Sequence, residues 1–527
     1  MNLKESCKNF LLLICSTLLV LVAAEAYFSF LETKSFDVEK YLKQASPKIE
    51  QDISQEVSVL VVGGSSAQMT PYYFRLTDLL GLILKDSLPA TTFKEVEGHR
   101  SGDSLQKRFD VAAKGLLKRP TFFILYSGHN EFLSHFSPNH MCEEEDALLI
   151  KVVEQSAMVR FFLERIRLSE LDDYDENRPL FDVPVACSKD WARRYTSYRY
   201  HLNALTKLSA ALEVPTILIF PAGNEAGDVP NRSVYTARED RKEEFRSLYL
   251  WGRYHLLLKD WNKASLCFDE ALEIDSNFAG LLYWKAVSLL NTGEPDEARK
   301  LFELAKDKDY YPVRGSSVQR GMMRSVADKF DAYFLDARSV VLNTSREAQL
   351  DRQFFVDTNH QSSNGYLEIA KSVAKVFLTH FEIRAREFPG REKLKQWVSE
   401  QIYHCWFCKI EESMKMNYGM SKLTFDSEVR LELALKYLHL LKLREVRTDA
   451  NPLEEINNKI KLYSKEYRSR LEVLLNPPKV KKRFKSACSF ELDPNRHKEI
   501  LEKVPGDDIV DYRTAINEFS WLPKVYD

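Results

Sequence analysis

The stretch VSVLVVGGSS, residues 57–66, determines the fold class. Its first six residues are almost all apolar and mostly β-branched, which is typical of a strand buried on both faces of a parallel sheet. Gly63 and Gly64 then permit a sharp turn, because glycine adopts backbone conformations closed to other residues. Ligands of open parallel sheets bind beyond the carboxyl ends of the strands. Ser65 therefore lies where a functional side chain is expected, although Gly-Gly-Ser-Ser is also a common loop sequence.

Further strand-like segments follow along the chain, with helical periodicity between them. We predict strands over residues 93–96, 121–126, 215–220 and 333–335, and helices over 72–84, 105–117 and 198–212. Strands that alternate with helices predict an α/β domain with a parallel sheet. The acidic, irregular stretch at about 137–194 is interpreted as an insertion near the active face, with a helix near 147–168.

Residues 245–312 contain two copies of a helical repeat. Gly252 and Ala286 are separated by the same interval as Phe268 and Phe302, and this interval is the period of about 34 residues found in tetratricopeptide repeats. Two such repeats rarely form a stable solenoid alone, so we expect them to pack on the α/β domain. Two interpretations remain open: a groove for a protein partner, and a helical wall that shapes the cleft.

An apolar segment, residues 10–30, precedes the domain. It is long enough to span a bilayer, and Lys4 and Lys8 favour an N-terminus left in the cytoplasm. A cleaved signal peptide is the competing interpretation, because residues 24–26 are Ala-Glu-Ala, which resembles a cleavage site. We favour an uncleaved anchor, with the rest of the chain on the extracytoplasmic side.

Composition limits the partners and cofactors. The net charge is −2, which disfavours nucleic acid as a partner. The 8 cysteines do not make a disulfide-dense scaffold, but Cys142 and Cys187 could pair outside the cytoplasm. The lone CxxC motif of Cys405 and Cys408 lacks a second pair of ligands for a metal. We therefore expect core thiols or a local disulfide there, and neither a metal nor a cofactor.

We divide the chain into six segments. In order they are a transmembrane anchor or signal (1–31), a connector (32–56), the first part of the α/β domain (57–236), the repeats (245–312), the second part of the α/β domain (320–381) and a C-terminal region (382–527). The last segment is charged and rich in leucine, which predicts helices. No chemistry is assigned to it.

Three polar segments follow predicted strands at the same sheet edge as Ser65. They are SGDS at 101–104, GHNE at 128–131 and DTNH at 357–360. Gly102 would let a backbone N–H point into the cleft, and the Asn130 amide can donate to a developing oxyanion. An Asp and a His three residues apart can form the pair that activates a serine. Each segment alone is also an ordinary loop, so the argument depends on their order.

Together the four segments resemble the sequence blocks of the SGNH (GDSL-type) hydrolase superfamily. The resemblance covers roughly residues 57–220 and 330–377. Hydrolases of this type that carry tetratricopeptide repeats behind a membrane anchor are similar to the whole layout. The resemblance implies a flavodoxin-like three-layer parallel sheet, with an all-α tetratricopeptide-like insertion and a helical C-terminal region.

The resemblance also implies the roles of five residues. Ser65 matches the nucleophile, and Asp357 and His360 match the catalytic dyad. The backbone N–H of Ser65 would form the oxyanion hole with Gly102 and Asn130.

Two residues depart from the pattern of the superfamily. Gly64 occupies the position of its usual Asp, and Glu131 replaces the Asp that usually follows the Asn. Neither change removes a required group, and we expect Glu131 to alter loop support rather than chemistry. Ser66 is kept as an alternative nucleophile.

These roles imply an esterase-like or lipase-like hydrolase that acts on an acylated envelope glycan or lipid through a covalent acyl-enzyme. An O-acyltransferase would use the same site, with a hydroxyl in place of water. A hypothesis of another class is an inactive interaction scaffold whose repeats recruit a protein. The complete set of five site residues argues against the scaffold. The expected partners are thus an acyl-ester substrate, a protein at the repeats and the membrane.

Overall fold

The computed structural model describes most of the 527-residue chain. The described residues are 20, 23–24, 37–48, 52–69, 75–132, 188–344, 350, 354–355, 357–384, 388, 394, 397, 414–415, 417–418, 427–448, 453–478, 488, 492 and 494–502. Several predictions fall on residues outside these ranges: almost all of the predicted anchor, most of the insertion, Cys142, Cys187 and the CxxC motif. Among the helices of the described residues, none combines the length and apolar character needed to span a bilayer.

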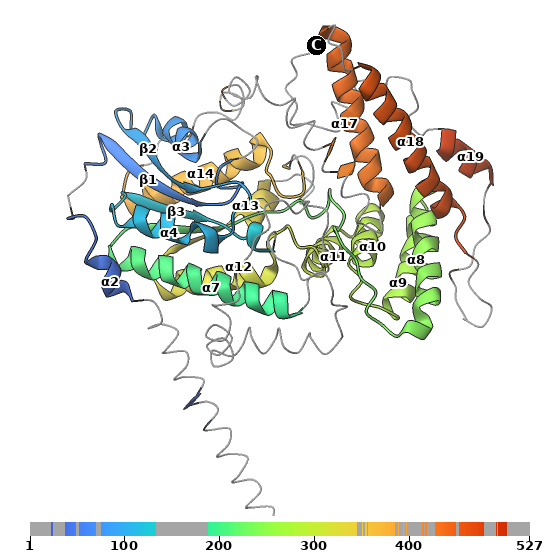
Figure 1. The fold of residues 1–527 in the computed structure, drawn as a ribbon, viewed down its shortest axis with the longest axis horizontal. Helices are drawn as coiled ribbons and strands as arrows, with labels where there is room; N and C mark the ends of the chain where they lie inside the picture. The colour runs from blue at the N-terminus through green and yellow to red at the C-terminus, as the bar shows by residue number, and fades with distance from the viewer. Residues whose placement is uncertain are drawn as a thin grey trace, which may run out of the picture.

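A five-stranded, all-parallel sheet forms the centre of the α/β domain (Figure 1). Its strands are β1 (Glu56–Gly63), β2 (Thr92–His99), β3 (Phe122–Tyr126), β4 (Thr216–Phe220) and β5 (Tyr333–Asp336). The five predicted strands are confirmed, and their order is β2-β1-β3-β4-β5, the order of flavodoxin-like sheets. Both β2 and β3 pair with β1, so the topological switch point lies between β1 and β3.

Helices cover both faces of the sheet and make a three-layer domain. In β1, Val59 and Val61 face one layer, whereas Leu60 and Val62 face the other. The first layer contains α3 (Leu76–Leu84), α13 (Ala337–Thr344) and α14 (Ser363–His380), and the second contains α4 (Leu105–Leu116), α7 (Ser188–Ala211) and α12 (Ser317–Lys329). Burial on both faces explains why the first strand is almost continuously apolar.

Two predicted boundaries change in the structure. Helix α7 begins at Ser188, ten residues before the predicted start at residue 198. The last residues of the predicted insertion (137–194) therefore belong to a core helix, because Trp191 and Tyr195 pack in the layer with α4. Part of the predicted connector also packs there: it forms α2 (Val38–Leu42), whose Val38 is buried in the same layer.

Residues 242–307 form two helix pairs, as the repeat pattern predicts. They are α8 (Lys242–Leu257) with α9 (Trp261–Leu272), and α10 (Ala279–Thr292) with α11 (Pro295–Asp307). The small residues lie where the helices approach closely: a Cβ at Gly252 would come within 2.2 Å of the Phe268 ring. Figure 1 shows these helices beside the α/β domain, with the C-terminal helices above them in this view.

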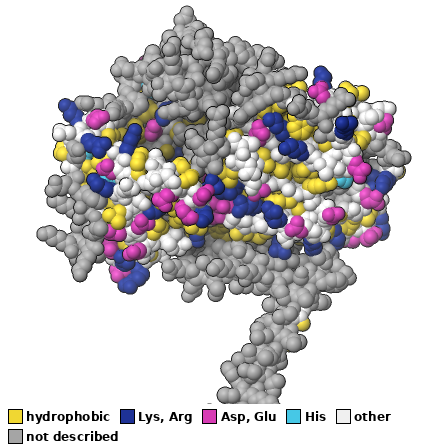
Figure 2. Space-filling model, turned by 180° about the vertical axis from the view of Figure 1, so that it is seen from behind, with side chains coloured by type: hydrophobic (Ala, Val, Ile, Leu, Met, Phe, Trp, Pro, Cys, Tyr) yellow, Lys and Arg dark blue, Asp and Glu magenta, His cyan; other side chains and the backbone are white. Residues whose placement is uncertain are grey.

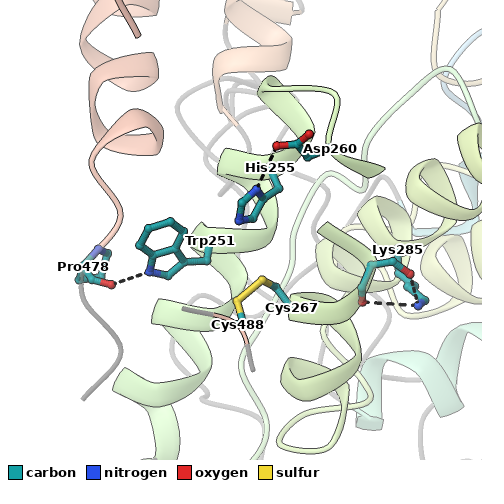
Figure 3. Close-up of a disulfide and its surroundings, with 8 residues drawn as sticks. Trp251, His255, Asp260, Cys267, Lys285, Pro478 and Cys488 are labelled. Atoms are coloured by element: carbon teal, nitrogen blue, oxygen red, sulfur yellow. Dashed lines mark hydrogen bonds and ion pairs between the residues drawn. A yellow bond between two sulfur atoms is a disulfide. The ribbon is translucent and has the colours of Figure 1, made fainter. Parts of the chain in front are cut away.

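The C-terminal region contributes α17 (Ser427–Thr448), α18 (Leu453–Leu475) and α19 (Pro494–Glu502). It packs against the repeats, where Leu474 and Leu475 enter the same apolar cluster as Phe245. A disulfide joins Cys267 of α9 to Cys488 (Figure 3). The sequence did not predict this pairing, because 221 residues separate the two cysteines.

The described surface carries a mixture of charges. Figure 2 shows Lys and Arg side chains interspersed with Asp and Glu over one face of the molecule. This pattern agrees with a net charge of −2.

Candidate active site

The end of β1 is shaped by two glycines with different requirements. Gly63 has a φ of +155°, and a Cβ there would lie 2.0 Å from the Tyr126 carbonyl oxygen at the end of β3. A Cβ at Gly64 would lie 1.9 Å from Asn130 Nδ2. With Asn130 in this position, residue 64 has no room for any side chain. Close packing against Asn130 therefore explains why residue 64 is Gly rather than the Asp of the SGNH pattern.

The loop after β2 meets the same point. Asn130 is the first residue of the short helix η1 (Asn130–Phe132), which comes after β3, and it donates from Nδ2 to the Asp103 carbonyl oxygen at 3.1 Å. The Ser101 N–H donates to Gln68 Oε1 at 2.8 Å. Gly102 has a φ of +78°, and a Cβ there would meet nothing within 4 Å. Glycine is thus needed at Gly102 for its backbone conformation, and the first three polar segments meet at the switch point.

The predicted dyad forms a hydrogen-bonded pair. His360 Nδ1 lies 2.7 Å from Asp357 Oδ2, while Asp357 Oδ1 accepts from the backbone N–H groups of Asn359 and His360 at 3.0 and 2.8 Å. Burial acts to raise the pKa of Asp357, but the attraction of His360 and these hydrogen bonds outweigh it and lower the pKa. The carboxylate therefore remains ionised and accepts the proton on Nδ1, which leaves Nε2 as a base. His360 Nε2 is buried and has no hydrogen-bond partner among the described residues.

A shared carbonyl brings the third and fourth segments together. His129 Nε2 and Gln361 Nε2 both lie within hydrogen-bond distance of the Ala222 carbonyl oxygen, at 3.0 and 2.8 Å. His129 Nδ1 accepts from the Gly315 N–H at 2.9 Å, so Nε2 must carry the proton. His129 precedes Asn130, and Gln361 follows His360. Both segments are therefore attached to the same carbonyl group, which lies after β4. No role was predicted for His129 or Gln361, because the motifs single out their neighbours Asn130 and His360.

Burial keeps His129 neutral. It lowers the pKa of His129 to about 3, and the nearby His360 acts in the same direction. A neutral imidazole can accept from one backbone group and donate to another, as His129 does here. His129 is therefore a structural bridge between the two halves of the site.

Glu131 supports the loop beside the candidate oxyanion hole. Its Oε1 accepts from the Leu105 N–H at 3.1 Å, at the first residue of α4. Burial raises the pKa of Glu131 to about 7, although the Leu105 hydrogen bond and the charge of Arg194 lower it in part. The side chain thus joins the end of β3 to the helix that follows Gly102. This contact agrees with the predicted role in loop support.

The two serines of the first segment are both buried, with exposed fractions of 4% for Ser65 and 5% for Ser66. Ser66 lines a small polar pocket with Tyr126 and Ser127. The hydroxyls of these three residues are buried, and none has a hydrogen-bond partner among the described residues. Among the described residues no hydrogen bond joins Ser65 to His360 Nε2, so the structure forms the Asp357–His360 pair but does not connect it to the candidate nucleophile.

The sequence matches no protein-family model and no curated protein. In the part of the chain that the structure describes, no cluster of three or more His, Cys, Asp or Glu side chains is arranged to hold a metal ion. The case for a function therefore depends on the geometry of the residues themselves.

Proposed function

We propose that this protein is a serine acyl-ester hydrolase of the SGNH type, with Ser65 as its nucleophile. One observation carries the proposal: the ionised Asp357 holds His360 by Nδ1, and the buried Nε2 has no hydrogen-bond partner among the described residues. This arrangement is the one that a general base for a serine requires. It occurs at the sheet edge where Ser65 and Asn130 also lie.

The proposed reaction proceeds through an acyl-enzyme. His360 Nε2 takes the proton of Ser65 Oγ while Oγ attacks the ester carbonyl carbon, and Asp357 stabilises the imidazolium. The tetrahedral oxyanion accepts hydrogen bonds from the backbone N–H groups of Ser65 and Gly102 and from Asn130 Nδ2. The C–O bond of the ester then breaks, and the departing alkoxide takes the proton from His360. Water repeats these steps, so that the acid is released and Ser65 regains its proton.

Asn130 has the donors that this role demands. A side-chain amide carries two N–H bonds, and the one to the Asp103 carbonyl leaves the other for the oxyanion. The bond to Asp103 also fixes the direction of the amide before substrate binds. Such preorganised donors cost no reorganisation during the reaction, and losing one typically lowers turnover by about 10²- to 10³-fold.

Two features support the choice of nucleophile and compartment. Ser65 is preferred over Ser66 because its position matches the nucleophile in the SGNH pattern, whereas burial does not distinguish the two serines. The Cys267–Cys488 disulfide favours an oxidising compartment, in line with the predicted extracytoplasmic body. We therefore propose an acylated envelope glycan or lipid as the substrate. If a hydroxyl of such a molecule replaced water, the same steps would transfer the acyl group.

A covalent probe tests the proposal directly. The full-length protein in detergent is treated with a fluorophosphonate, beside Ser65→Ala, Ser66→Ala and His360→Ala. We expect the wild type and Ser66→Ala to be labelled, and the other two variants to lose labelling. Folded wild-type protein that is not labelled would contradict the proposed function. Labelling that survives Ser65→Ala but not Ser66→Ala would move the nucleophile by one residue.

A further inference from the structure

The C-terminal region buries a charged side chain that points back to the α/β domain. Arg430 of α17 is among the largest fully buried side chains, with an exposed fraction of 1%. It forms an ion pair with Asp228 Oδ1 at 2.7 Å and donates to Val229 and Asn231 at 3.2 and 3.0 Å. It also donates to Asn417 Oδ1 at 3.2 Å. Three of its four partners thus lie in the loop after β4, about 200 residues earlier in the chain.

The second oxygen of Asp228 reaches the candidate catalytic loop. Asp228 Oδ2 accepts from the Thr358 hydroxyl. Thr358 immediately follows Asp357 and lies two residues before His360. One carboxylate therefore lies between the guanidinium of α17 and the loop that carries the dyad.

The same β4 loop also holds the backbone of the dyad loop. The Asn224 N–H donates to the Thr358 carbonyl at 2.9 Å, and Asn224 Nδ2 donates to the Asp357 carbonyl at 3.1 Å. Arg314 donates to the carbonyl oxygens of Asn224 and Asp228 at 2.8 and 2.9 Å. Residues 224–228 thus form a platform that contacts the dyad loop and is held by two buried arginines, Arg314 and Arg430.

The chemistry of these contacts indicates positioning. A buried ion pair adds little net stability compared with apolar side chains of the same size, because both charges lose their hydration. Hydrogen bonds to Val229 and Asn231 fix the direction of the guanidinium, because such bonds are directional. The guanidinium then holds Asp228 Oδ1 beside it by charge attraction, as an ion pair. Asp228 in turn fixes the hydroxyl of Thr358. An apolar contact at this place would join α17 to the domain equally well, but it would not set the direction of the dyad loop.

We propose that Arg430 is a positioning residue of the active site, and that through Asp228 and Thr358 it holds the loop of Asp357 and His360 in its reactive geometry. The C-terminal region thereby completes the site. This inference rests on the proposed function, because its effect is read through the reactivity of Ser65.

The test uses the rate of fluorophosphonate labelling in the full-length protein, resolved into a maximal rate and a probe affinity. Arg430→Met and Thr358→Val should each lower the maximal rate by about 10- to 100-fold with little change in affinity, because a displaced base slows the chemical step. Thr358→Ser keeps the hydroxyl and should restore labelling. The double variant should be no slower than Arg430→Met alone, since both changes break one chain of contacts.

Tyr467→Phe is the matched control in the C-terminal helices. It removes the hydrogen bond from Tyr467 to Glu432 Oε2, at 3.3 Å, without touching the platform. We expect its labelling rate to equal that of the wild type. Circular dichroism reports whether each variant is folded, and the Thr358 pair decides the question if Arg430→Met does not fold.

The outcomes separate the two proposals. If the wild type is labelled and Thr358→Val is labelled as fast as Thr358→Ser, Arg430 and Thr358 have no positioning role and the proposed function stands. If folded Arg430→Met reacts at the wild-type rate, the inference is overturned in the same way. If the wild type itself does not react, the proposed function fails and this inference fails with it.

Discussion

The two ends of the candidate site are built differently. At the switch point between β1 and β3, glycine allows backbone and an amide to meet closely, as where Gly64 faces Asn130. Around the dyad loop, buried charges from distant parts of the chain meet instead, as where Arg430 pairs with Asp228. Close packing around glycine thus places the candidate oxyanion donors, whereas an ion pair between residues far apart in sequence lies beside the loop of the candidate base.

The largest effect is expected at the base itself. Asp357→Asn keeps the size of the side chain but removes the charge that stabilises the imidazolium and fixes its tautomer. We expect kcat/KM for a simple acyl ester to fall by about 10⁴-fold, as when a triad aspartate is replaced in this way. Asp240→Asn, at an exposed ion pair with Arg238, is the control and should be unchanged. A loss of less than tenfold in Asp357→Asn would show that Asp357 does not orient and stabilise the imidazole of the base.

The next effect is expected at the opposite end of the site. Gly64→Ala places a Cβ 1.9 Å from Asn130 Nδ2, so the amide must move. We expect turnover to fall by about 10²- to 10³-fold, the loss of one oxyanion donor. Gly321→Ala, in α12, is the control, because a Cβ there meets nothing within 4 Å. If Gly64→Ala kept full turnover, close packing at this glycine would not position the oxyanion donor.

The contrast between the two ends also explains what the sequence could predict. The strands were predictable because β1, β3 and β4 are buried on both faces and are nearly uniformly apolar. Ser65 and Asn130 come after those strands, so their meeting at one edge follows from the topology. The start of α7 was predicted too late, because its first turns are rich in charged residues and its apolar period is weak there.

The platform that contacts the dyad loop could not be predicted in the same way. Arg430 lies in a helix whose charged residues look like an ordinary solvated surface, and nothing local distinguishes it from its neighbours. Its burial depends on how α17 packs on residues about 200 positions earlier. The Cys267–Cys488 pair escaped prediction for the same reason, since cysteine spacing alone does not define connectivity.

The smallest of the predicted effects concerns the pH dependence of folding stability. It is expected at Glu131, a buried acid in the segment after β3. The pKa of Glu131 is about 7 in the folded chain against 4.5 ordinarily, because burial disfavours the charged form. An acid with a raised pKa contributes its stability fully below pH 4.5, and this contribution is lost as the pH rises through about 7. The loss is about 3 kcal/mol at most, at about 1.4 kcal/mol for each pH unit.

Glu131→Gln should remove that dependence and leave the contact intact. The amide oxygen of Gln still accepts from the Leu105 N–H, but it never ionises. Urea unfolding at pH 5, 6, 7 and 8 should therefore show a smaller loss of unfolding free energy in the variant than in the wild type. Glu97→Gln, at an exposed ion pair with Arg75, should follow the wild type. Parallel curves for Glu131→Gln and the wild type would mean that Glu131 is ionised throughout. The segment after β3 would then contain a buried charge, as residues 224–228 do. Buried charge would therefore not distinguish the two ends of the site.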